Sequence, residues 1–171
     1  MNVYMTAGTY DFLKTIQDKY PNEQMTLMQN TEGAQLMHET AGKSVFQMPR
    51  KYEVIESVGE IPETGYVAAS HVPVRDEGKP VFEFACKNRD RIVEQQQGFK
   101  AYRVLRPLSG DTYVIVSIWE DGEAYNRWQR SDLFQEAGGQ PEVKVGENKS
   151  VLAGPSYVST FIISRGEETA I

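Results

Sequence analysis

The chain has 171 residues, and its 24 acidic residues outnumber its 18 Lys and Arg residues, which gives a formal net charge of −6. Its 40% hydrophobic and 25% charged residues are typical of a folded globular protein, and its single cysteine, Cys86, excludes an internal disulfide. The acidic balance argues against general nucleic-acid binding, and no apolar run approaches the roughly 20 residues of a membrane-spanning helix.

The N-terminal residues lack the basic start and apolar stretch of a secretory signal, so we expect a cytoplasmic protein. Residues 1–60 are predicted to form a β-rich half that begins with a strand over 2–7. A helix is expected over 10–20, where Phe12, Leu13 and Ile16 recur at helical spacing. Two strands over 24–29 and 35–39 follow, and 52–58 fits a strand or a short helix. The Gly- and Pro-containing segment 59–65 is the predicted boundary.

Residues 66–165 are predicted to form a second unit, which begins with a strand over 66–74. A long helix should follow, with Pro80 in its first turn and Gly98 as its C-terminal stop. Strands over 99–105 and 112–119 flank a hairpin signal, Asp121 can cap a second helix that residues 137–139 end, and 157–164 is the last strand. The order β-α-β-β-α-β predicts an α+β, ferredoxin-like fold, in which two helices cover one face of a four-stranded antiparallel sheet. The N-terminal half resembles a partial copy of this unit.

One stretch of the second unit carries a family resemblance. In TYVIVSIWEDGEAYNRWQRSDLF, a strand ends in Trp and is followed by the pattern Ala-aromatic-x-x-Trp-x-x-Ser-x-x-Phe. This motif resembles the antibiotic-biosynthesis-monooxygenase (ABM) superfamily, and within it the haem-degrading monooxygenases of the IsdG and HmoB type. The β-rich first half and its GTYDFL sequence are similar to HmoB and to the related TRAP proteins (target of RNAIII-activating protein).

The resemblance implies haem as both substrate and oxygen-activating cofactor, with an external electron donor. In IsdG-type enzymes the chemistry rests on an Asn of the first ABM strand, a Trp of the second helix and a haem-ligating His. These positions fall at Ser70, Trp128 and Gly138 in this sequence, so the Trp alone matches. Ser70 keeps a hydrogen-bond donor with a shorter reach, whereas Gly138 has no side chain to ligate iron.

Other residues near these positions have two interpretations each. His71 is a weak candidate for a replacement iron ligand, because successive residues of a strand face opposite sides and Ser70 and His71 cannot both face the helices. Arg127 and Arg130 flank Trp128 and could bind haem propionates, or they could form an ordinary solvated helix face. Trp128 itself is either a pocket wall beside the porphyrin or a core residue.

Two hypotheses of function follow from these residues. The first is a haem-binding protein with haem-degrading monooxygenase activity, which opens the porphyrin and releases iron. The alternative is a non-catalytic TRAP-like regulatory or stress protein with a vestigial or repurposed ABM pocket, and the missing iron ligand favours it. A cofactor-free oxygenase acting on a small aromatic is a third reading.

The resemblance also bears on oligomeric state. ABM units usually dimerise into a barrel, and here the N-terminal half could take the partner's place within one chain. We therefore expect a monomer, with a homodimer as the alternative, and no nucleic-acid or membrane partner.

Overall fold

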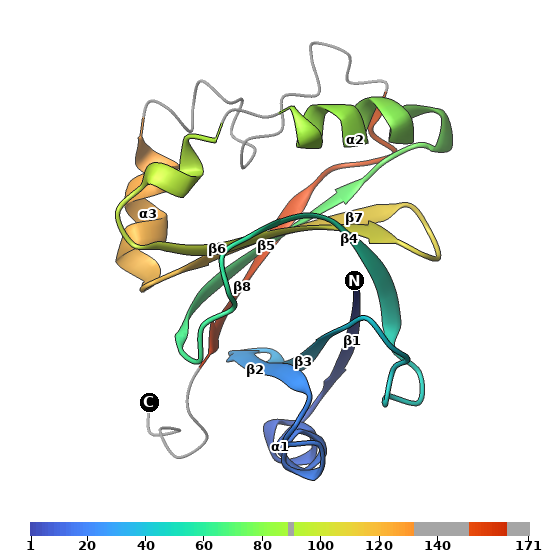
Figure 1. Cartoon of the computed structure of the whole chain (residues 1–171). Coiled ribbons are helices and arrows are strands. Elements are labelled where there is room, and N and C mark those ends of the chain that lie inside the picture. Colours follow the sequence, from blue (N-terminus) through green and yellow to red (C-terminus); the bar gives the residue numbers. More distant parts are fainter. Residues whose placement is uncertain (89–90, 132–150, 164–171) are drawn as a thin grey trace.

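The computed structural model describes residues 1–88, 91–131 and 151–163 (Figure 1). The N-terminal half contains one helix and four strands: β1 (Asn2–Gly8), α1 (Tyr10–Lys19), β2 (Gln24–Asn30), β3 (Gly33–Thr40) and β4 (Arg50–Val58). The Thr9 side chain accepts a hydrogen bond from the amide of Phe12 and caps α1. Residues 52–58 lie in β4, so the strand, and not the short helix, is confirmed there.

The described residues of the C-terminal half follow the predicted order of four strands and two helices: β5 (Gly65–Pro73), η1 (Asp76–Gly78), α2 (Lys79–Lys87), η2 (Val93–Gln95), β6 (Phe99–Pro107), β7 (Thr112–Trp119), α3 (Gly122–Arg130) and β8 (Tyr157–Ile163). The two short η elements are 3₁₀ turns on either side of α2. Among the described helices, none is long and apolar enough to cross a membrane.

The eight strands form one closed antiparallel barrel in the order β1-β3-β2-β8-β5-β7-β6-β4, and β4 pairs with β1 to complete it. The C-terminal strands follow the order β8-β5-β7-β6, which is the ferredoxin-like arrangement. The N-terminal strands follow the order β4-β1-β3-β2, and whether this half is a partial copy stays a prediction. Pairing of β2 with β8 and of β4 with β6 joins the halves, so both contribute to a single barrel.

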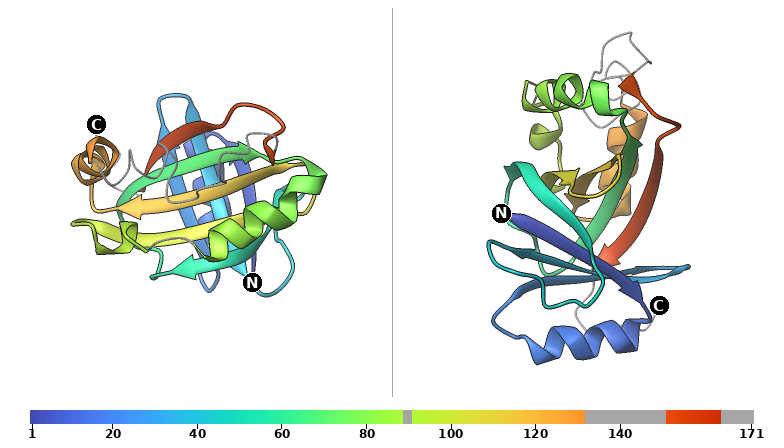
Figure 2. Two further views of the ribbon diagram at one scale, coloured as in Figure 1. Left: turned by 90° about the horizontal axis from the view of Figure 1, so that it is seen from above. Right: turned by 90° about the vertical axis from the view of Figure 1, so that its right-hand side faces the viewer.

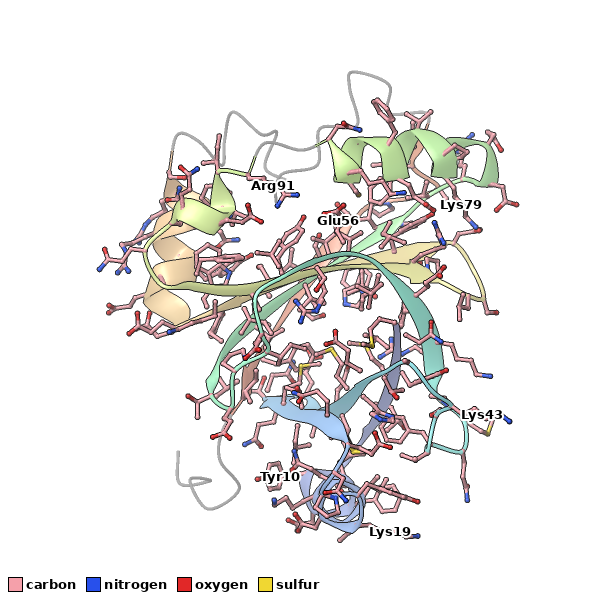
Figure 3. The ribbon with its side chains drawn as sticks, in the orientation of Figure 1. Tyr10, Lys19, Lys43, Glu56, Lys79 and Arg91 are labelled. Carbon is pink, nitrogen blue, oxygen red and sulfur yellow. The ribbon has the colours of Figure 1, made fainter. Side chains whose placement is uncertain are left out.

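The helices lie outside the barrel on opposite sides (Figures 1 and 2). Helix α1 covers the N-terminal strands, whereas α2 and α3 cover the C-terminal strands. Buried side chains form three cores: one beneath α1 that includes Leu13 and Leu36, one inside the barrel that includes Met28 and Val114, and one beneath α2 and α3 that includes Phe82 and Trp119. Figure 3 draws the side chains of these layers.

A buried ion pair links the two halves across the barrel interior. Arg103 of β6 is 4% exposed, and its Nε donates to the carboxylate of Glu39 in β3 at 2.8 Å. The Nη1 atom of Arg103 also donates to the backbone carbonyls of Val58 and Tyr102, at 3.0 and 2.9 Å. These partners satisfy a charged group that would otherwise be costly to bury.

The first C-terminal helix is shorter than predicted. The prediction that the first extends to Gly98 is wrong, because the side chain and the backbone amide of Asn88 both donate to the Phe84 carbonyl and close α2 at Lys87. Gly98 instead turns the chain into β6 with φ of +88°. Helix α3 ends at Arg130 because Ser131 is extended, and the predicted stop at 137–139 lies outside the described residues.

Candidate functional site

Ser70 lies on the face of β5 that α2 and α3 cover. Its neighbours two positions away, Ala68 and Val72, belong to the core beneath these helices, whereas Val67 and Ala69 belong to the barrel interior. Ser70 is 3% exposed, and no hydrogen bond joins its hydroxyl to another of the described residues. The hydroxyl is therefore a polar group in largely apolar surroundings.

Trp128 reaches the same core from α3. The carboxylate of Asp121 accepts a hydrogen bond at 2.9 Å from an amide of the first turn and caps this helix. The Trp128 side chain is 2% exposed and stacks on Trp119, with ring centroids 6.4 Å apart and planes 26° apart. The indole N–H of Trp119 in turn donates to Ser117 at 3.0 Å. The structure thus places Trp128 and Ser70 on one face, with Trp128 held by aromatic packing.

A charged network that the sequence pattern did not predict ties α2 to the sheet. Glu83 of α2 accepts hydrogen bonds from the guanidinium of Arg106, with Nε at 2.9 Å, and from the hydroxyl of Tyr113. Arg106 also forms an ion pair with Glu53 at 2.5 Å. The hydrogen bond from Arg106 holds the pKa of Glu83 below its usual value, and burial raises the pKa of Tyr113.

These four groups come from four different elements, so no local spacing indicates them. The one signal in the sequence is the acidic Glu83 within the apolar helical run VFEFAC. The network anchors α2 over the C-terminal strands, and it leaves the Arg106 charge neutralised by two carboxylates.

Arg127 and Arg130, the predicted propionate-binding residues, lie in the last turn of α3. Both are exposed, and neither forms an ion pair with another of the described residues. They flank the buried Trp128 in sequence while their own side chains lie on the surface of the helix. Gly138, the position of the family's iron ligand, lies outside the described residues.

His71 does not share a face with Ser70. Its ring stacks on Tyr157 of β8, with centroids 4.4 Å apart and planes 9° apart, and it lines a pocket of about 350 Å³ at one end of the barrel. Burial and the charge of Arg50 lower the pKa of His71. The structure therefore separates His71 from the face that carries Trp128.

His38, the second histidine, is fully buried beneath α1. Its Nε2 lies 3.1 Å from a carboxylate oxygen of Glu23. The rings of Tyr4 and Phe46 pack at centroid distances of 6.2 and 5.8 Å on either side of it. This histidine thus belongs to the layer on the far side of the barrel from α2 and α3 (Figure 1).

Comparison with known proteins adds a family to this geometry. Residues 66–139 match the family model described as antibiotic biosynthesis monooxygenase. The chain is 31% identical over 136 residues to the signal transduction protein TRAP of Staphylococcus epidermidis, which covers 80% of this chain and 81% of the relative. The chain belongs to the TRAP family. A TRAP protein of Staphylococcus aureus is 32% identical over 134 residues, with 78% and 80% of the two chains covered.

Solved structures of both a regulator and an enzyme share the fold of this TRAP-family chain. A structure described as a major regulator of staphylococcal pathogenesis has a TM-score of 0.85 and 26% identity, over 96% of this chain and all of that chain. A heme-degrading enzyme from Listeria monocytogenes has a TM-score of 0.71 and 22% identity, over 94% and 98% of the two chains. The likeness to the enzyme shows the fold alone, so the side chains beneath α2 and α3 must distinguish the two functions.

Those side chains do not fit a haem whose iron is bound by the usual residues. The chain has two histidines, and the structure places both of them, His38 and His71, away from the core beneath α2 and α3. None of the six methionines belongs to this core. Residues 132–150 contain no His, Met, Cys or Tyr, so that segment has no common axial ligand to contribute.

The remaining ligand types beneath α2 and α3 are phenols and one thiol. Four tyrosines belong to this core or pack against it: Tyr66, Tyr102, Tyr113 and Tyr125. Burial raises the pKa of Tyr125 to about 12, and Tyr113 donates to Glu83, so the phenolate that iron prefers is disfavoured at these two positions. Cys86 is fully buried in the same core. Among the described residues, no group of three or more His, Cys, Asp and Glu is placed to hold a metal ion.

Proposed function

We propose that this chain is a cytoplasmic regulatory protein of the TRAP type, and that the ABM face beneath α2 and α3 is a packed core without haem-degrading activity. The observation that carries this proposal is the position of the two histidines. Haem degradation needs an iron ligand at the pocket, and both His38 and His71 lie on other faces of the barrel. The identity with signal transduction proteins over four-fifths of the chain also supports a regulatory role.

The packing of the face supports the same function. Phe82, Tyr113, Trp119 and Trp128 are each 2% exposed or less, and Trp128 stacks on Trp119. A porphyrin would have to displace several of these rings, each of which contributes a large buried apolar area to stability. The face beneath α2 and α3 therefore resembles a close-packed hydrophobic core more than a binding cleft.

A haem-degrading monooxygenase that uses an external electron donor is the second candidate. It is favoured by one observation, the placement of Ser70 and Trp128 on the same face of the C-terminal unit. In that function Ser70 would offer a hydrogen bond, and Trp128 would contact the porphyrin.

A haemin titration of the full chain, read in the Soret region, separates the two candidates. We expect no saturable one-to-one change, and no catalase-resistant loss of the Soret band after a reductant is added. Saturable binding followed by catalase-resistant loss would overturn the proposal. Trp128→Phe and Ser70→Ala variants would then be expected to slow that loss.

A complementation experiment tests the regulatory role directly. Deletion of the gene should change the levels of a defined set of transcripts, and wild-type protein should restore them. A Ser70→Ala variant should restore these transcript levels equally well, because the proposed regulatory role does not use the Ser70 hydroxyl. Unchanged transcripts in the deletion strain would contradict the proposal.

We further propose that the chain is a monomer. The eight strands of one chain already close the barrel, so the N-terminal strands take the place that the sheet of a second copy would fill. Light scattering should give the chain mass of 19.3 kDa. A value of twice this mass would contradict the monomer.

A further inference from the structure

The pocket that His71 lines lies at one end of the barrel, and none of its lining residues belongs to α2 or α3. It has a volume of about 350 Å³, and its walls come from the ends of five strands that are consecutive around the barrel: β8, β5, β7, β6 and β4. These strand ends lie toward the side of the molecule that faces the reader in the right-hand view of Figure 2. We call it the mouth pocket, and its polar lining residues are Arg50, Lys51, Tyr52, His71, Ser109, Asp111, Thr112 and Tyr157.

The mouth pocket carries an excess of positive charge within an acidic protein. Arg50 and Lys51 of β4 line it, and neither forms an ion pair with another of the described residues. Arg50 donates a single hydrogen bond, to the neutral amide of Gln35 at 3.3 Å. The one carboxylate of the lining, Asp111, is bound at 3.0 Å by Lys79, which Figure 3 labels at the start of α2. Among the described residues these two exposed cations have no counterion, although the net charge of the chain is −6.

Two buried donors complete the lining. His71 is 9% exposed and Tyr52 is 6% exposed, and no hydrogen bond joins either side chain to another described residue. The stacking of His71 on Tyr157 holds the imidazole in place between β5 and β8. Because both residues line the pocket and neither has its polar atoms among the buried unpaired ones, these atoms are open to the pocket. A ligand with several acceptor oxygens could accept a hydrogen bond from each of them.

We propose that the mouth pocket binds the phosphoryl group of a small organic molecule. A guanidinium, an ammonium, an imidazole and a phenol converge on it from β4 and β5, and all four can donate to an anionic oxygen. A phosphoryl group offers three oxygens in a tetrahedral arrangement, so it satisfies more of these donors than the two coplanar oxygens of a carboxylate. The volume leaves room for a small organic body beside the phosphoryl group.

This site is independent of the function proposed for the core beneath α2 and α3. Val67 and Ala69 belong to the barrel interior and His71 continues that face, whereas Ser70 faces the helices. A ligand in the mouth pocket therefore does not touch Ser70 or Trp128. The haemin titration reports on one face and the experiment below on the other, so the two proposals fail separately.

The two histidines make the test internally controlled. Proton NMR of the full chain should show one imidazole C2–H signal from His71 and one from His38. Inorganic phosphate, added at constant ionic strength, should shift the His71 signal saturably and raise the pKa of His71, because a nearby anion favours the imidazolium. The His38 signal should stay unchanged, since that ring lies beneath α1.

Matched variants decide whether the pocket is responsible. Arg50→Gln should weaken the phosphate response about tenfold or more, because it removes a charge-assisted hydrogen bond. Lys19→Gln removes an exposed cation from α1, far from the pocket, and should leave the response intact (Figure 3). An equal response in Arg50→Gln, no saturable shift in the wild type, or the same shift with chloride would overturn the proposal. Acetate that binds as tightly as phosphate would overturn the phosphoryl assignment.

Discussion

Replacement of Trp128 by alanine is expected to lower the free energy of unfolding by about 4 kcal/mol. The side chain is 2% exposed. A buried aromatic of this kind removes about 150–250 Å² from water, which at about 25 cal/mol per Å² corresponds to about 4–6 kcal/mol. Large-to-small substitutions of buried Trp and Phe cost about 3–5 kcal/mol. At about 2–4 °C per kcal/mol for a chain of this length, the expected fall in Tm is about 8–16 °C.

Urea unfolding followed by fluorescence measures this effect, because Trp119 remains as the probe. Trp128→Phe should cost less, about 1–2 kcal/mol, since it keeps an aromatic ring in the core. Phe84→Ala is the matched control: Phe84 lies on α2 but is 69% exposed, so its loss should change stability by no more than about 0.5 kcal/mol.

The refuting result is a small effect at Trp128. A loss below about 1.5 kcal/mol for Trp128→Ala, with an unchanged denaturant slope, would mean that the indole borders space open to solvent. The face beneath α2 and α3 would then be a pocket, and the haem-degrading candidate would gain the support that the packing now denies it.

Three further substitutions test how the elements are held together. Glu83→Gln should lower the free energy of unfolding by about 1–2 kcal/mol at pH 7. The hydrogen bond from Arg106 lowers the pKa of Glu83 in the folded state below 4.5. The stabilisation by Glu83 is therefore present above pH 4.5 and is lost as the pH falls through the folded pKa. Urea midpoints of wild type and variant should converge toward acid pH, and a constant gap would contradict this. Glu39→Gln should cost about 3–5 kcal/mol by leaving Arg103 buried without a counterion, and a urea midpoint equal to wild type would show that the pair is dispensable. Gly98→Ala should lower the free energy of unfolding by about 2 kcal/mol or more in the same assay, because φ is +88° and a β-carbon would lie 2.5 Å from an alanine side chain of α3. An unchanged free energy of unfolding would contradict this close approach.

Local patterns predicted most of the strands, because alternation and turn residues act within a few positions of the chain. They failed where the deciding interaction was a single side chain. The two hydrogen bonds from Asn88 to the Phe84 carbonyl end α2 at Lys87, whereas the sequence pattern predicts a helix up to Gly98. Helix propensity alone cannot indicate that stop.

Closure of the barrel depends on pairing between strands that lie far apart in the sequence, which no local pattern predicts. Met28 of β2 pairs with Ile163 of β8, and Asn2 of β1 pairs with Glu53 of β4. The sequence suggested that the N-terminal half could take a partner's place, but it could not specify these registers, since strands of similar composition have many possible neighbours.

In the candidate site, too, local patterns predicted some features, and contacts between distant residues could not be predicted. Trp128 and Ser70 were found through a family motif, and the alternation along β5 predicts that Ser70 and His71 face opposite sides. The Glu83–Arg106 network was missed because its members lie 23 positions apart and on different elements. The mouth pocket was missed for the same reason, since Arg50 and His71 are brought together only by the closed barrel.

The separation of the two faces can itself be tested. Because Trp128 of α3 packs into the core on one face of β5 and Arg50 lines the mouth pocket on the other, their effects should add. Trp128→Phe should keep the phosphate response of His71, and the double variant Trp128→Phe with Arg50→Gln should lose stability as the sum of the single losses within about 0.5 kcal/mol. If Trp128→Phe abolished the response, β5 would be coupling its two faces, and the core and the pocket would have to be treated as one site.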